Sequence, residues 1–171
     1  RGRLPVRSVR PSKMEHVREV AGPGVVLIGA VAGGLFADAV TKQWAIAAVP
    51  WGGDRLLVPG LLRVTLTCNT GASFGMLRAY PCLLTVVAAA AIVGLLVLWW
   101  YAGQDRMLLS GAVGLDVAGA AGNLADRLAY GGVVDFLRFD FLRWWPAFNV
   151  ADALMVVGTF LLVYALSTSS S

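Results

Sequence analysis

Four long apolar stretches divide the chain, and each has the length of a helix that crosses a membrane. They cover residues 22–48, 79–104, 107–127 and 149–167. About 20 apolar residues suffice to span a bilayer. The second stretch carries no charged residue, whereas Asp38 and Lys42 interrupt the first and Asp116 lies within the third. The pattern predicts an all-α membrane protein with four transmembrane helices, folded as a single domain over the 171 residues.

Two longer segments, residues 49–78 and 128–148, connect these stretches on one side of the membrane. Apolar and polar residues alternate over 61–67, next to the turn-forming pair Pro59 and Gly60, so 49–78 is predicted to form a small extracytoplasmic β-structure. Residues 128–148 are rich in aromatic side chains, which are typical of an amphipathic segment at the membrane interface. An ordinary aromatic belt would explain the tryptophans almost as well.

The composition agrees with a membrane protein, and the basic residues before the first span indicate its orientation. Hydrophobic residues make up 58% of the chain and charged residues only 14%, against about 25% charged in soluble domains. Residues 1–21 form a basic arm before the first span, which we interpret as a cytoplasmic flank rather than a nucleic-acid patch. Lys and Arg are equally numerous on the two sides, so the orientation rests on the first span. We therefore expect cytoplasmic termini and no nucleic-acid partner.

Two aspartates, Asp135 and Asp152, lie at the edges of predicted spans. A carboxylate at the centre of a membrane helix costs roughly 2.5–3.5 kcal/mol on insertion scales, so such groups usually perform chemistry, move ions or pair with a charge. If the two carboxyl groups approach closely, one keeps its proton while the other acts as a base on water. The alternative is a pair of helix N-cap carboxylates, which fits Asp152 well and Asp135 poorly.

Other polar residues accompany this pair. Asn149 lies one turn before Asp152 and can orient its carboxylate, while Asn123, Asp126 and Arg127 share one face near the outer end of the third span. A polar cap that ends the third helix is the alternative for this second group, although it does not explain the deeper position of Asn123. The small residues Gly119–Gly122 would let helices pack closely in lipid.

Three further positions are candidates with structural alternatives. Asp38 and Lys42 are four residues apart, so they share a helical face. We expect them to shape the site rather than to catalyse. Asn69 belongs to a predicted turn, where its amide would either stabilise the loop or bind a substrate backbone.

No metal or cofactor is expected. The only histidine, His16, lies in the basic arm, and neither a Cys/His cluster nor a serine with a neighbouring histidine base is evident. The two cysteines, Cys68 and Cys82, are interpreted as small buried residues, with a disulfide as the alternative.

The order of these motifs resembles the lipoprotein signal peptidase (signal peptidase II) family over residues 25–166. The matching residues are Asp38 and Lys42, Asn69-x-Gly-Ala, Gly-Asn123-x-x-Asp126-Arg127, Gly-x-Val-Asp135-Phe and Phe-Asn149-x-Ala-Asp152. The resemblance implies a bacterial intramembrane aspartic endopeptidase. Such enzymes remove the signal peptide of prolipoproteins just before a cysteine that carries diacylglycerol.

The resemblance also assigns roles and a fold. It places Asp135 and Asp152 at the catalytic dyad and Asn123, Arg127 and Asn149 at supporting positions, with Asn69 and Asp126 as further motif residues. It implies four transmembrane helices, a small extracytoplasmic β-structure and an interfacial helix. We expect a monomer in the bacterial cytoplasmic (inner) membrane, with membrane lipids and a lipid-modified prolipoprotein as its partners and the active site toward the outer leaflet.

The chain departs from the family pattern at Ser73, Gly75 and the pair Ala118 and Gly119, and Asp116 has no counterpart in it. Three other classes of protein remain as alternatives: a small transporter lined by carboxylates, a metal-dependent lipid transferase, and a structural membrane subunit. The transporter would not require amides and an arginine collected at one membrane face. The transferase would lose activity with a chelator.

Overall fold

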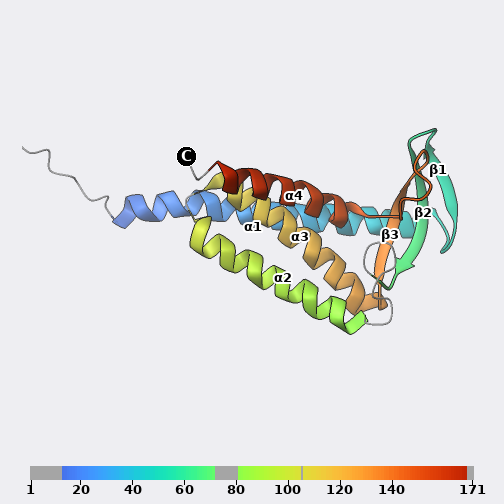
Figure 1. The fold of residues 1–171 in the computed structure, drawn as a ribbon, viewed down its shortest axis with the longest axis horizontal. Coiled ribbons are helices and arrows are strands. Elements are labelled where there is room, and N and C mark those ends of the chain that lie inside the picture. Colours follow the sequence, from blue (N-terminus) through green and yellow to red (C-terminus); the bar gives the residue numbers. More distant parts are fainter. Residues whose placement is uncertain (1–12, 72–80, 105, 169–171) are drawn as a thin grey trace, which may run out of the picture.

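A bundle of four helices carries a small sheet across one end (Figure 1). The computed structural model describes residues 13–71, 81–104 and 106–168. The helices are α1 (Lys13–Ala48), α2 (Pro81–Ala102), α3 (Met107–Tyr130) and α4 (Val150–Ser167). The strands are β1 (Asp54–Val58), β2 (Leu62–Asn69) and β3 (Val133–Phe139). The start of α1 and the end of α4 both lie at the end of the bundle away from the sheet (Figure 1).

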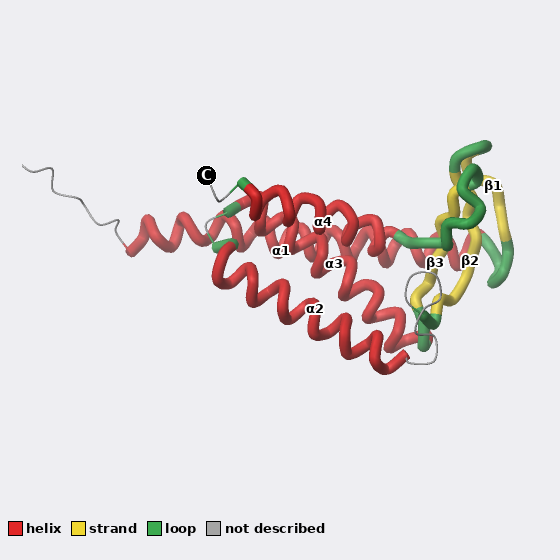
Figure 2. Tube along the Cα trace, viewed as in Figure 1, coloured by secondary structure: helices red, strands yellow, loops and turns green. Residues whose placement is uncertain are grey.

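The sheet is antiparallel in the order β1-β2-β3, so a chain segment that follows α3 pairs with the hairpin that follows α1 (Figure 2). Its register places Thr67 opposite Asp135 and Asn69 opposite Val133. A cluster of buried apolar side chains joins the sheet to the end of α1. This cluster contains Ala45, Val49, Val64, Leu66, Val134 and Phe136. The sheet is therefore fixed to the bundle by its own apolar face.

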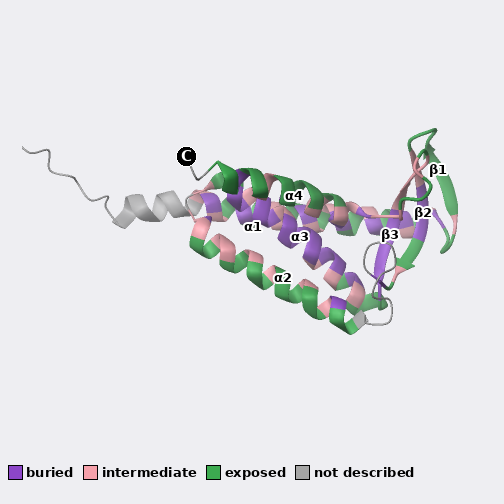
Figure 3. Ribbon diagram, viewed as in Figure 1, coloured by how far each residue is buried: buried purple, intermediate pink, exposed green. Residues whose placement is uncertain are grey.

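Helix α3 is the centre of the bundle and packs against the other three helices. In the described chain all four helices have the length and hydropathy of membrane spans; 67% of the α3 span is buried inside the protein, against 6% of the α2 span. The outer surfaces of the other helices are exposed and apolar (Figure 3). This distribution is that of a protein whose outer surface contacts lipid. The predicted fold class, an all-α membrane protein with a small β-structure, is confirmed.

The prediction for residues 128–148 is wrong in its detail, because no helix lies at the interface there. Helix α3 continues to Tyr130 and ends at Gly131, whose φ of 72° is favoured by glycine. The next residues form β3, and the rest of the segment is a loop that returns to α4. The reason lies in residues 133–137, where Val133, Val134 and Phe136 are of the β-branched and aromatic types that favour strands, and the segment pairs with the free edge of β2.

Two other details differ from the prediction. Helix α1 begins at Lys13, so part of the expected basic arm is helical. Cys68 and Cys82 are free and exposed, contrary to the expectation that they are buried. Residues Ser73 and Gly75 lie outside the described residues.

Candidate functional site

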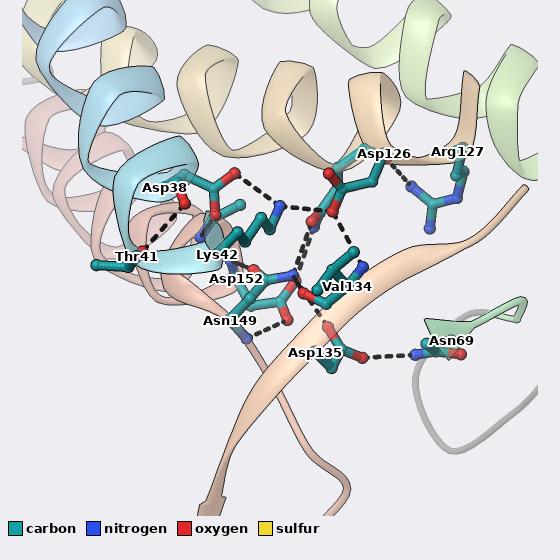
Figure 4. A network of polar contacts seen from close by, with 12 residues as sticks. Asp38, Thr41, Lys42, Asn69, Asp126, Arg127, Val134, Asp135, Asn149 and Asp152 are labelled. Carbon is teal, nitrogen blue, oxygen red and sulfur yellow. Dashed lines mark hydrogen bonds and ion pairs between the residues drawn. The ribbon is translucent and has the colours of Figure 1, made fainter. Parts of the chain in front are cut away.

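The two predicted acidic residues are brought together at the end of the bundle by one asparagine, Asn149. Asp135 lies on β3, Asp152 lies in the first turn of α4, and Asn149 precedes that helix. The Asn149 Nδ2 group donates to Asp135 Oδ1 at 2.9 Å. Its backbone N–H donates to Asp152 Oδ2 at 3.2 Å, while its Oδ1 accepts from the Asp152 N–H at 2.9 Å (Figure 4). A single fully buried residue thus contacts both carboxylates.

Asn149 also determines how α4 begins. It is the N-cap of the helix, and Asp152 is the third helical residue of a reciprocal capping box. The alternative interpretation of Asp152 as the N-cap is therefore wrong, because the N-cap lies three residues earlier at Asn149, although the Asp152 carboxylate does take part in the capping box. The capping geometry holds the Asp152 side chain against the end of the bundle.

The outer end of α3 supplies the next contacts. Asn123 Nδ2 donates to Asp152 Oδ1 at 2.8 Å, and Asn123 Oδ1 accepts from Asn149 Nδ2 at 2.9 Å. Arg127 donates through Nη1 to the Asn123 carbonyl oxygen at 3.3 Å, so it stays beside the cluster without forming an ion pair in the described chain. Of the predicted shared face of α3, Asn123 is thus turned toward the start of α4, whereas Asp126 contacts Lys42 of α1 and Val134 of β3. Asn69, Asn123, Asp135, Asn149 and Asp152 are called the polar cluster below.

Asn69 reaches this cluster from the end of β2. Its Nδ2 donates to Asp135 Oδ2 at 3.1 Å, and its Oδ1 accepts from the Gly71 N–H at 3.0 Å. The second contact is the predicted turn, which begins at an asparagine. Through its bond to Asp135, the Asn69 amide holds the carboxylate in place, so Asn69 orients Asp135.

Asp38, Lys42 and Asp126 form a buried ion triad beneath the polar cluster. The Lys42 ammonium lies 2.7 Å from Asp38 Oδ2 and 2.7 Å from Asp126 Oδ2. Each carboxylate also accepts a backbone N–H, from Ala151 to Asp38 at 3.0 Å and from Val134 to Asp126 at 3.0 Å. Ala151 and Val134 are the immediate neighbours of Asp152 and Asp135. The triad therefore positions both segments that carry the predicted dyad.

Close helix packing makes these contacts possible. A Cβ atom on Gly119 would overlap the Ala151 carbonyl oxygen, and one on Gly122 would overlap the Asp38 carboxylate. The predicted role of the small residues on α3 is confirmed, because only glycine lets α1 and α4 approach this closely.

Burial and charge act together on Asp135. Its side chain is buried, and the removal of water together with the nearby Asp152 carboxylate raises its pKa to about 7. The hydrogen bonds from Asn69 and Asn149 and the charge of Lys42 oppose this rise. The Asp135 carboxyl group is therefore suited to hold and to donate a proton near neutral pH.

Asp116, for which the sequence offered no role, lies apart from these contacts. It is buried in α3, accepts a hydrogen bond from Thr159 Oγ1 at 3.3 Å and packs against Gly158. It links α3 to α4 within the bundle. The sequence did not predict that the N–H groups of Val134 and Ala151 bind the carboxylates of the ion triad, because these contacts depend on how the helices approach one another.

The fold and the polar cluster define a class: a multi-pass membrane protein with two carboxylates and three amides gathered at one end of its bundle. Among the described residues, no group of three His, Cys, Asp or Glu side chains is arranged to hold a metal ion. The chemistry this arrangement offers is proton transfer at a site beside the membrane.

Comparison with known proteins identifies the family. A family model described as signal peptidase (SPase) II matches residues 30–168. A lipoprotein signal peptidase of Pelotomaculum thermopropionicum is 40% identical over 136 residues, which are 80% of this chain and 88% of the relative. One of Mycobacterium avium is 35% identical over 151 residues, which are 81% of this chain and 76% of the relative. A solved bacterial membrane enzyme aligns with a TM-score of 0.78 and 27% identity, over 85% of this chain and 89% of that chain.

The chain belongs to the signal peptidase II family. It is therefore a peptidase and a multi-pass protein of a bacterial membrane. The resemblance drawn from the sequence motifs is confirmed.

Proposed function

We propose that this protein removes signal peptides from bacterial prolipoproteins, cutting on the N-terminal side of a diacylglyceryl-modified cysteine, and that Asp135 and Asp152 activate the attacking water. The observation that carries the assignment is Asn149, which holds both carboxyl groups through one buried side chain and its own N–H. Two carboxyl groups that share a site suit an aspartic mechanism, since they do not both ionise easily.

The contacts of the two aspartates favour a different role for each. Asp135, with its raised pKa, holds the proton and donates a hydrogen bond to the scissile carbonyl oxygen. Asp152 receives hydrogen bonds from Asn123 and Asn149, which orient its carboxyl group, and takes a proton from the water. The water oxygen then bonds to the carbonyl carbon. When the tetrahedral intermediate collapses, Asp152 returns the proton to the leaving amine.

The remaining site residues position this pair. Asn69 orients Asp135, and the ion triad of Asp38, Lys42 and Asp126 holds the backbone beside each aspartate. Arg127 borders the cluster and supplies a positive charge for the negative charge that develops on the intermediate. In this assignment the sheet lies outside the cytoplasmic membrane, where a lipid-anchored substrate arrives at the outer leaflet.

The test uses the purified protein in lipid nanodiscs and a prolipoprotein that carries diacylglycerol on its cysteine. We expect the protein to release the signal peptide, and either Asp135→Asn or Asp152→Asn to lower kcat by about a thousandfold or more. Asp116→Asn is the matched control, because it changes another buried carboxylate and keeps an oxygen for the Thr159 hydroxyl.

Full activity of Asp152→Asn would refute the dyad. Loss of cleavage in Asp116→Asn with unchanged unfolding would show that buried carboxylates in general, rather than this pair, are required. A chelator is expected to leave the rate unchanged, whereas a chelator-sensitive rate would indicate metal-dependent hydrolysis and refute the dyad mechanism.

A further inference from the structure

The sheet has two chemically different faces. The face toward α1 is apolar and contains Val64, Leu66, Val134 and Phe136. Side chains alternate along a strand, and the opposite face is polar. Its residues in β2 and β3 include Thr65, Thr67, Asn69 and Asp135. Arg138 also lines this face, because the register between β2 and β3 shifts between Val64 and Thr67 and interrupts the strict alternation. Together with the loop at residues 143–147, this polar face lines a pocket of about 460 Å³, called the sheet pocket below.

The sheet pocket is continuous with the polar cluster. Asp135 and Asn69 belong to both, and they are hydrogen-bonded to each other at 3.1 Å. A group that enters the pocket therefore lies next to a carboxyl group of the proposed dyad. The volume is within the range of roughly 300–1,000 Å³ that is usual for ligand sites.

Two arginines give the pocket a positive charge. Arg138 donates through Nη2 to Asp54 at 3.0 Å, but its buried Nε has no hydrogen-bond partner among the described residues. Asp54 is already shared with Arg63, which lies 2.9 Å away. A buried N–H without an acceptor is costly, so an oxygen of a ligand would relieve it.

Arg143 adds the second charge from the loop. It is exposed, and within the described chain it makes no hydrogen bond or ion pair; it acts on Asp140 only through a longer-range attraction. Its neighbours Trp144 and Trp145 form an aromatic wall of the same pocket. An arginine beside aromatic rings is suited to a carboxylate on a peptide.

The floor of the pocket offers acceptors for a peptide backbone. The Thr65 hydroxyl donates to the Gly53 carbonyl at 3.0 Å, and the Thr67 hydroxyl donates to the Asp135 carbonyl at 3.3 Å. Both hydroxyl protons are thus donated within the protein, and the two hydroxyl oxygens can still accept hydrogen bonds from the N–H groups of a peptide. The pocket combines acceptors on one wall with cations on another, which matches an extended peptide that carries an acidic side chain.

We propose that the sheet pocket binds the residues that directly follow the modified cysteine, and that Arg138 and Arg143 favour an Asp or Glu among them. The proposal rests on the function proposed above. The acyl chains and the signal-peptide helix are apolar and belong beside the exposed apolar faces of the helices, whereas the sheet lies beyond the ends of those helices (Figure 3). The part of the substrate that leaves the membrane is the part that reaches the pocket.

The test compares three diacylglyceryl prolipoproteins that differ only in the two residues after the cysteine: Asp-Glu, Asn-Gln and Lys-Lys. We expect kcat/KM to be about tenfold higher for the acidic than for the neutral substrate, as for one charge-assisted hydrogen bond at a partly exposed site. Arg143→Gln should bring this ratio close to one. Arg143→Glu should invert the order in favour of the lysine substrate, which a merely structural role would not do. Arg55→Gln, on β1 and outside the pocket, is the matched control and should keep the ratio.

The outcomes separate the two proposals. Equal cleavage of all three substrates by the unaltered protein overturns the pocket assignment and leaves the peptidase function standing. No cleavage of any substrate overturns the proposed function, the removal of signal peptides from diacylglyceryl prolipoproteins. A rate that depends on Arg143 and on phosphatidylglycerol in the nanodisc, but not on the substrate's charge, assigns the pocket to an anionic lipid headgroup and overturns the peptide assignment.

Discussion

At the scale of residues, the site depends on amides that satisfy carboxylates. Asn149 uses its two amide protons for Asp135 and Asn123, and Asn123 in turn donates to Asp152. A buried carboxylate without such donors would be costly, while an asparagine adds no charge of its own. The arrangement links the two acidic groups through shared amides, which suits their proposed role as a dyad.

The raised pKa of Asp135 predicts a pH dependence of the reaction. The group carries its proton below about pH 7 and loses it above, and the proposed mechanism needs the protonated form. We expect kcat/KM, which reports the free enzyme, to fall as the pH rises through about 7. Asn69 stabilises the ionised form, so Asn69→Ala should raise this pKa and move the fall to higher pH. The measurement is a pH profile of signal-peptide release for both proteins.

Asp116→Asn is again the control, and its profile should coincide with that of the unaltered protein. A shift of the Asn69→Ala profile to lower pH would contradict the proposed role of Asp135 as the protonated partner.

Much of this site could be predicted from the residues, and the rest could not for a physical reason. The spacing of Asn123, Asp126 and Arg127 placed them on one helical face, and Asn149 was expected to orient Asp152. The backbone contacts of Asp38 with Ala151 and of Asp126 with Val134 were not predicted. They join segments distant in sequence, and spacing along the chain carries no information about such contacts.

At the scale of elements, the contact between α3 and α4 is the critical one, because Asn123 must reach Asp152 across it. A methyl group on Gly119 would meet the Ala151 carbonyl oxygen and the Met155 side chain. We expect Gly119→Ala to push α4 away, to cost about 1–3 kcal/mol of stability, and to lower kcat more than it changes KM. Thermal unfolding in detergent and cleavage kinetics measure the two effects.

Gly33→Ala on α1 is the matched control, since a Cβ there meets nothing within 4 Å. It should leave both unfolding and cleavage nearly unchanged. Equal effects of the two substitutions would mean that helix flexibility, rather than the distance between α3 and α4, decides the activity.

The elements also show where sequence patterns mislead. Apolar length predicted the four helices because a membrane span tolerates little else. The aromatic residues of 128–148 predicted an interfacial segment, yet β3 formed because the edge of β2 offered unpaired N–H and C=O groups. Composition indicates where a segment lies, whereas strand pairing depends on a partner elsewhere in the chain.

At the scale of the whole molecule, the polar cluster and the sheet pocket lie at the same end of the bundle, away from the start of α1 and the end of α4 (Figure 1). The expected orientation places that end outside the cytoplasm. The basic residues of the sheet do not oppose this orientation strongly, since Arg63 and Arg138 are paired with Asp54. The first span, preceded by the basic arm, is expected to decide the orientation.

Cysteine labelling tests this orientation directly. In a protein whose Cys68 and Cys82 are replaced by Ala, Arg55→Cys places one thiol on the exposed strand β1, and Thr168→Cys places one at the exposed end of α4. We expect a membrane-impermeant maleimide to label the β1 cysteine in intact spheroplasts and the α4 cysteine only after permeabilisation. The reverse pattern would place the polar cluster on the cytoplasmic side. A lipid-anchored substrate in the outer leaflet would then not reach Asp135 and Asp152, and the proposed function would fail together with the orientation.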